Sequence, residues 1–137
     1  MKVVNDEHLD LEYNDDLKCI IQSWKGYFNS DFFRNGVEKT NQLFEKQAPV
    51  EIFLVDISTS GVIKNEDTEW AAETAIPRAI KNGLKYYGFV VPENVFAQLS
   101  LNNFRKQLNQ PSLETKLFDN LNSAKKWAEE INERVMG

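Results

Sequence analysis

The sequence predicts an α/β protein with a mixed, mostly parallel five-stranded sheet and about four helices. Short apolar runs of β character alternate along the chain with segments whose apolar residues recur every three to four positions. The run "VEIFLVDI" is almost continuously apolar, as expected for a central strand covered on both faces. We therefore expect the order β-β-α-β-α-β-α-β-α with right-handed crossovers, in which only the first strand is antiparallel.

The first two strands are predicted to form a hairpin. Leu9, Leu11 and Tyr13 alternate with acidic residues, which is typical of a strand with one buried face. The residues "NDD" at 14–16 favour a turn, and "LKCIIQSW" at 17–24 is apolar and β-prone. A helix that begins at Ser30 or Asp31 and ends before Pro49 should follow. Its predicted buried stripe is Phe33, Val37, Thr40, Phe44 and Ala48.

The second half of the chain predicts two strand–helix repeats after the central strand at 50–57. Asn65 is expected to cap a helix that runs to Asn82-Gly83. Pro77 lies inside this span and lacks an amide hydrogen, so a kink or a two-piece helix is expected. "LKYYGFVV" at 84–91 is then a strand, and a helix runs from Pro92 to about Leu108.

The last strand is predicted at 113–118, "LETKLF", and Asn122 or Ser123 is expected to cap the final helix. That helix shows a continuous apolar stripe. The stripe consists of Ala124, Trp127, Ala128, Ile131 and Val135.

Composition predicts one soluble domain spanning residues 1–137. The net charge of −5 opposes binding to phosphate backbones, so we expect no nucleic-acid partner. No apolar run reaches the roughly 18 residues of a membrane span. Cys19 is the single cysteine, and the N-terminal residues do not read as a leader peptide, so a cytoplasmic protein is expected.

A functional site is expected at the carboxyl ends of the parallel strands, where ligands bind in open α/β sheets. These ends are "WKGYF", "DISTSG" and "VPEN". The residues predicted to form this binding surface are Trp24, Tyr27, Asp56, Ser58, Ser60, Trp70 and Asn94.

Two features of this surface allow more than one interpretation. The hydroxyls of "DISTSG" could carry a phosphoryl group that switches binding, or could form an ordinary turn. Five residues separate Ser60 from Asn65, so these hydroxyls are expected in a loop before the helix. Likewise, the aromatic residues could line an apolar pocket, or could be plain core or a partner-facing patch.

Motifs that would indicate catalysis or a cofactor are missing from the sequence. It contains no glycine-rich nucleotide fingerprint, no phosphate loop and no nucleophile elbow. His8 is the only histidine, is expected at the surface, and has no partner at metal-ligand spacing. We therefore expect a protein that is not an enzyme and carries neither metal nor cofactor.

Four segments carry a family resemblance that covers most of the chain. They are "EIFLVDI" followed by "STSG", "NEDTEW", "GLKYYGFVVPENVF", and "LFDNLNSAKKWAEE". With these segments the chain resembles the STAS superfamily of sulphate-transporter and anti-sigma-factor-antagonist domains. It looks closest to the stand-alone bacterial branch, which is similar to the CRAL-TRIO lipid-binding fold.

The resemblance implies a binding module without catalytic residues, in which a serine after the central strand is phosphorylated by a partner kinase. Ser60 and Ser58 are the matching positions, although Ile57 and Ser58 interrupt the family pattern. The expected function is thus protein–protein interaction in bacterial signalling. The alternatives are a carrier of a lipid or other small hydrophobic ligand, which requires a closed apolar cavity, and an enzyme with an unmarked site. A homodimer through a sheet edge or a helix face is also compatible with this reading.

Overall fold

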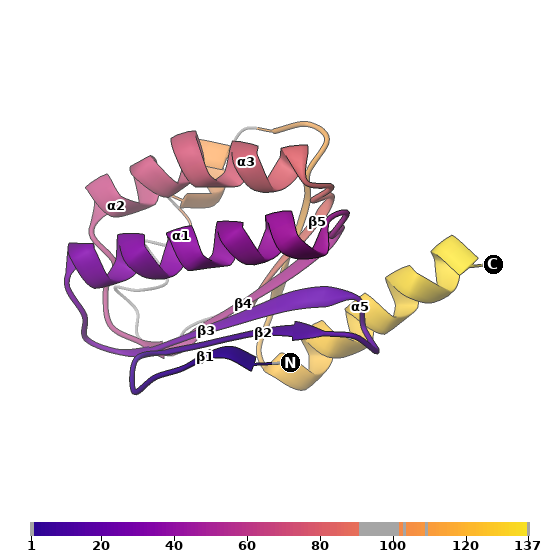
Figure 1. The fold of residues 1–137 in the computed structure, drawn as a ribbon, viewed down its shortest axis with the longest axis horizontal. Coiled ribbons are helices and arrows are strands. Elements are labelled where there is room, and N and C mark those ends of the chain that lie inside the picture. The colour runs from indigo at the N-terminus through magenta and orange to yellow at the C-terminus, as the bar shows by residue number, and fades with distance from the viewer. Residues whose placement is uncertain (1, 91–101, 103, 109, 137) are drawn as a thin grey trace.

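A computed structural model of the chain describes residues 2–90, 102, 104–108 and 110–136, with side chains up to residue 134. It contains one sheet whose strand order is the order of the chain (Figure 1). β1–β2 and β2–β3 pair antiparallel, and the remaining neighbours pair parallel. The predicted α/β class with a mixed sheet is therefore confirmed. The strands are β1 (Lys2–Asn5), β2 (Leu9–Asn14), β3 (Cys19–Gly26), β4 (Ile52–Ser60), β5 (Tyr86–Val90) and β6 (Glu114–Phe118).

The sheet has six strands, so the prediction of five was wrong by one edge strand. β1 is short and mostly exposed, and it pairs only with β2. Only Val4 packs against the larger core, so the strand shows no regular alternation of apolar and polar side chains. The antiparallel part of the sheet consequently comprises two pairings instead of the one expected.

Helices lie on both faces of the sheet, but unequally (Figure 1). α1 (Ser30–Gln47), α2 (Asn65–Trp70), the π-helix η1 (Ala71–Ala75) and α3 (Ile76–Lys81) form one layer. Residues 104–108 are also helical, and the buried Phe104 and Leu108 belong to the same core as this layer. α5 (Leu121–Met136) lies on the other face and contacts β4, β5 and β6.

Two separate cores result from this arrangement, because the side chains of a strand alternate between the two faces. On β4, Phe53 and Val55 enter the larger core beneath α1, whereas Ile52 and Leu54 enter the smaller core beneath α5. The continuous apolar pattern of this strand is thereby explained, as predicted. Trp127 and Ile131 of α5 are buried in the smaller core, which confirms the apolar stripe for the residues whose side chains are described.

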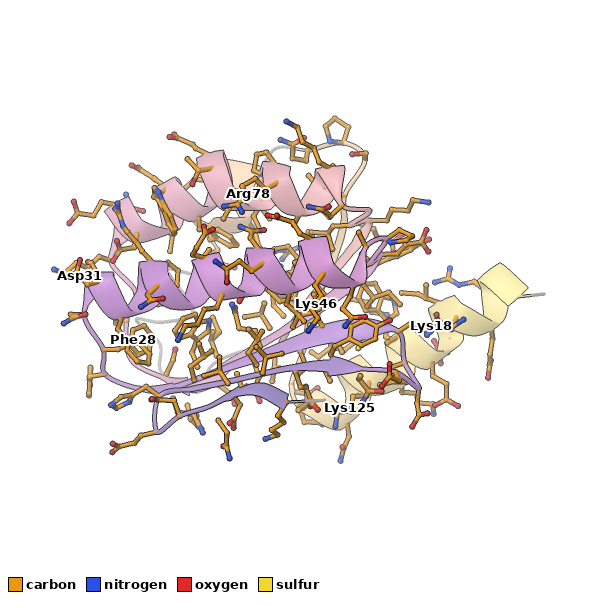
Figure 2. The ribbon with its side chains drawn as sticks, in the orientation of Figure 1. Lys18, Phe28, Asp31, Lys46, Arg78 and Lys125 are labelled. Carbon is orange, nitrogen blue, oxygen red and sulfur yellow. The ribbon has the colours of Figure 1, made fainter. Side chains whose placement is uncertain are left out.

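Gly36 allows α1 to approach the hairpin closely. A Cβ atom at this position would lie 2.5 Å from Cη2 of Trp24 and 2.8 Å from Cδ2 of Leu9. These separations are shorter than any van der Waals contact, so a larger residue would push the helix away from the sheet. The aromatic ring of Phe28 lies at the same end of α1, between the helix and the sheet (Figure 2), and stacks at 6.4 Å on Phe33.

The helix starts differ from the predicted caps. Asn29, not Ser30 or Asp31, caps α1 by accepting a hydrogen bond from the Phe32 amide. Asn65 is the first residue of α2 and not its cap; its amide group donates to Glu69 instead. Similarly, the Ser123 amide donates to Asn120, which lies just before α5. Short polar residues cluster at each of these starts, and sequence alone does not distinguish which one adopts the cap geometry.

The irregularity expected at Pro77 is confirmed, and it is a π-helical segment. The amide of Ile76 donates to the carbonyl of Ala71, five residues earlier, which is the π-type hydrogen bond. Pro77 follows in the first turn of α3, where its missing amide hydrogen costs least. The helix ends as predicted, since Gly83 has a φ of +110° and the Leu84 amide donates to Ala79.

Several predictions fall outside the described residues, including the helix start at Pro92 and the position of Asn94. Val91, at the end of the predicted strand, is also outside them. Within the residues described, no helix is both long and apolar enough to cross a bilayer.

Candidate functional site

A partly open cavity of about 70 Å³ lies between the sheet and its larger helical layer. Its floor is the inner face of β3, β4 and β5, whose paired residues lie side by side. One row across the floor joins Gln22 to Val55 and Val55 to Phe89. A neighbouring row places Phe53 beside Tyr87, and their rings stack with centroids 5.0 Å apart.

The roof of the cavity combines large residues on α1 with small ones on the opposite helix. Phe33, Val37 and Phe44 line it from α1. Facing them, Ala71 and Ala75 of η1 and Ala79 of α3 line the cavity with single methyl groups. Because protein interiors are close-packed, a space of this size requires such small side chains at one wall. The alanines at this wall therefore account for the cavity.

The π-helical segment keeps these alanines on one wall. Residues spaced by four drift around an α-helix because one turn contains only 3.6 residues. A π turn closes five residues apart and is wider, so the drift within η1 runs the other way. The wall made by Ala71, Ala75 and Ala79 is thus continuous. Such π segments are frequent at functional sites.

Polar side chains concentrate at this cavity. Six polar or charged residues are buried among the described residues, and five of them line the cavity. Buried polar residues are more informative than buried apolar ones, because each requires a hydrogen-bond partner. The five are Gln22, Thr40, Asn41, Ser60 and Thr68.

A chain of hydrogen bonds satisfies part of this set. The indole Nε1 of Trp24 donates to Oε1 of Gln22 at 2.7 Å, and Nε2 of Gln22 donates to Oγ1 of Thr40 at 2.8 Å. The Thr40 hydroxyl donates in turn to the backbone carbonyl of Gly36 at 2.8 Å. The chain fixes the Gln22 amide orientation and connects β3 to α1. Its members are therefore held in place at the cavity wall.

Asn41 and Tyr87 also line the cavity, but their polar groups have no hydrogen-bond partner among the described residues. Both residues are at least nine-tenths buried, at 3% and 4% exposure. Burial raises the pKa of the Tyr87 phenol well above its usual range, and no charged group contributes to this shift. Of the described lining residues, Tyr87 is the only titratable one. None of the described lining residues is thus charged near neutral pH.

A buried carboxylate joins the two helices beside the cavity. Asp67, next to the lining residue Thr68, is 3% exposed. Its Oδ2 accepts from the Ser30 hydroxyl at 2.6 Å, and its Oδ1 accepts from Nε of Arg34 at 3.0 Å. The Arg34 guanidinium also lies 4.9 Å from the ring centroid of Trp70. We call Ser30, Arg34, Asp67 and Trp70 the α1–α2 clamp.

The predicted site residues occupy different surroundings. Trp24 and Ser60 line the cavity, whereas Trp70 belongs to the α1–α2 clamp. Tyr27 is 80% exposed, and its ring packs over the backbone of Gly61. Asn94 lies outside the described residues. The structure therefore brings together only part of the predicted set.

Asp56 and Ser58 belong to a β-bulge. Ser23 pairs with Asp56 and Lys25 pairs with Thr59, so the strand β4 carries one extra residue. The carboxylate of Asp56 accepts hydrogen bonds from the Ser58 amide at 3.0 Å and from the Ser58 hydroxyl at 2.6 Å. It thereby satisfies an amide that a bulge leaves unpaired.

The hydroxyl residues were predicted to lie in a loop, and that prediction was wrong. Ser58, Thr59 and Ser60 form the end of β4, because the bulge lets this strand continue alongside β3. The Ser60 hydroxyl is buried and lies 3.0 Å from the carbonyl oxygen of Gly61. Ser58 is only partly buried.

Sequence reasoning missed Gln22, Asn41 and Tyr87 as site residues. Gln22 carried a usable signal, since it is the one amide within the apolar run of its strand. Asn41 lies beside Thr40, which was assigned to the buried stripe, so it too could have been placed at the cavity. Tyr87 has no local signal, because strands commonly contain tyrosine.

The expected surface position of His8 needs correction. Its ring is partly buried, Nδ1 donates to the Lys25 carbonyl at 2.8 Å, and it meets the Phe32 ring edge-on at 5.8 Å. This contact arises because the turn before β2 folds back over the end of α1. Across the described part of the chain, no three His, Cys, Asp or Glu side chains are grouped as metal ligands would be.

The sequence matches no protein-family model. No individually characterised protein matches it either.

Proposed function

We propose that this is a non-catalytic binding protein that holds a small, largely apolar molecule in the cavity between the sheet and the α1 layer. The observation that carries the proposal is the gathering of five of the six described buried polar residues around one cavity. Ligand sites are mostly apolar concavities with a few placed polar groups. The carrier alternative calls for a closed apolar cavity between sheet and helices; this cavity is largely apolar and partly open, and it supports that alternative ahead of partner binding.

Kinship with the stand-alone STAS proteins and the CRAL-TRIO fold remains part of this proposal. The mixed sheet with helices on both faces is compatible with it. Under the proposal, the clamp between Asp67 and Arg34 holds the roof over the cavity, and the Gln22–Thr40 hydrogen bond holds its floor and roof together.

The test uses benzene as a probe and fills the cavity by mutation. Millimolar benzene should raise the melting temperature of the wild-type protein, because a ligand that binds only the folded state stabilises it. Ala75→Leu should abolish this rise by occupying the same space, and Ala71→Val is a smaller filler if the first variant folds poorly. Glu73→Leu, on the exposed side of η1, is the matched control and should respond like wild type.

Native mass spectrometry of gently purified protein provides the complementary measurement. A non-covalent mass that is lost on denaturation, and is absent from Ala75→Leu, would identify a natural ligand. Equal benzene responses in wild type and both filled variants would contradict the proposal, because binding would then lie elsewhere.

A second candidate function is recognition of a protein partner at the carboxyl edge of the sheet. Tyr27 is 80% exposed and Val62 49% exposed, and both adjoin Gly61. Replacing both residues by serine should abolish capture of a specific partner, whereas Val3→Ser, in the edge strand β1, should not. Unchanged capture by the double variant would remove this edge as the interface.

A further inference from the structure

The cavity lining constrains the charge of its occupant. The lining contains aliphatic, aromatic, amide and hydroxyl groups, and none of its described residues carries a charge near neutral pH. Transfer of an ionised carboxylate or ammonium group into such surroundings is strongly unfavourable without an opposite charge. The nearby charges of Asp67 and Arg34 are already paired with each other. The described lining therefore favours an uncharged occupant.

The size of the cavity excludes long lipids in the closed form. About 70 Å³ is room for about five water-sized groups, since each needs roughly 10–15 Å³ by the same measure. That space suits a short alkyl chain; benzene occupies an engineered cavity of about 150 Å³, so a single ring must also use the open side of this cavity. A long acyl chain would need the helical layer to move away from the sheet.

Two polar side chains, Asn41 and Tyr87, line this space, and no hydrogen bond joins either of them to another described residue. The Asn41 amide offers both a donor and an acceptor, and the Tyr87 hydroxyl offers the same pair. A ligand group that both donates and accepts, such as an alcohol or a primary amide, would pair with them.

We infer that the ligand is a small, uncharged molecule with a single ring or short-chain body and one hydroxyl or amide group paired with Asn41 and Tyr87. The inference rests on the proposed function and specifies its ligand class. Phe53 and Phe89 on the floor supply an apolar surface for the body of the molecule. The alternative occupant is ordered water, which the same polar groups would hold.

Four probes of similar size separate these properties: toluene, benzyl alcohol, benzoate and benzylamine in its charged form. Affinities are measured from amide shifts in two-dimensional NMR spectra of the isotope-labelled protein at neutral pH. Benzyl alcohol should bind most tightly, toluene about tenfold more weakly, and the two ions at least a further tenfold more weakly. Equal binding of either ion would overturn the conclusion about charge.

Variants test the polar contact. Tyr87→Phe removes only a hydroxyl and should weaken benzyl alcohol binding about fivefold to tenfold, while toluene binding stays constant or improves. Gln42→Val is the control for the helix, because this neighbour of Asn41 is exposed and should change neither affinity. Asn41→Val removes the amide with a small change in volume, so it provides the same test if Tyr87→Phe does not fold.

The outcomes distinguish the inference from the proposed function. If toluene binds but benzyl alcohol gains nothing from Asn41 or Tyr87, the ligand class is wrong and the cavity function stands. If none of the four probes binds, the cavity holds only water, and both conclusions fall together.

Discussion

Cys19 illustrates how a residue's chemistry follows from its place in the sheet. It is fully buried on the face of β3 that belongs to the smaller core. Burial raises the pKa of its thiol from the usual range to about 12, and Glu12 adds to the shift while Lys125 opposes it. The neutral thiol is therefore the form that the folded state favours.

This raised pKa predicts an unreactive thiol in the folded protein. At pH 8.5, a pKa near 12 leaves about a thousandfold less thiolate than in an ordinary cysteine. Reaction with a disulfide reagent should therefore be at least that much slower in buffer than in urea, where the chain is unfolded. Labelling in buffer at the rate of free glutathione would contradict the assignment.

The raised pKa of Cys19 also predicts how the stability of the protein changes with pH. Since the folded pKa lies above the unfolded one, the contribution of Cys19 is complete below about pH 8.5 and is lost as pH rises toward 12. Cys19→Ala should flatten this part of the stability profile relative to wild type.

At the scale of elements, the contact between α1 and α2 depends on a carboxylate that water does not reach. Asp67 accepts two hydrogen bonds there, whereas Arg34 remains 42% exposed. Two further ion pairs join the same helical layer: Arg78 of α3, labelled in Figure 2, donates to Glu38 and Glu45 of α1. The three side chains of these pairs are well exposed. The Asp67–Arg34 pair thus differs from them mainly in the burial of its carboxylate.

Asp67→Asn should lower the free energy of unfolding by about 1–3 kcal/mol, because charge-assisted hydrogen bonds to a buried group are lost. Glu38→Gln is the matched control, and its effect should stay within about 1 kcal/mol, as for exposed ion pairs generally. Urea unfolding monitored by circular dichroism measures both values. Equal losses in the two variants would show that burial of Asp67 does not set its contribution.

The boundaries of some helices and strands cannot be predicted from the local sequence. The π-helical segment could be placed near Pro77 because a missing amide hydrogen acts locally. The extension of β4 through Ser60 could not be predicted, because it depends on a bulge and on pairing with β3. When pairing with a distant strand determines the structure of a segment, the sequence of that segment alone does not predict it.

For the whole molecule, the pattern of apolar residues predicts the fold class. A strand covered on both faces has a continuous apolar run, whereas a helix covered on one face has an apolar residue every three to four positions. The continuous apolar run of β4 and the stripe of α5 are both consequences of a sheet with helices on two faces. The cavity is different. It arises where the methyl groups of Ala71, Ala75 and Ala79 face α1 across the cavity, on the same side of the sheet, and sequence alone gives no indication of which distant residues meet. The predicted surface consequently captured Trp24 and Ser60 but not Asn41.

The strand order allows the sheet to form sequentially as the chain is synthesised. Because each strand pairs with the one made just before it, every new strand emerges with a partner already synthesised. Such sequential pairing keeps loop-closure costs low and suits folding from the N-terminal end. α5 follows all six strands, so the face that it covers stays open to water until the end. The nascent chain thus closes its larger core before its smaller one.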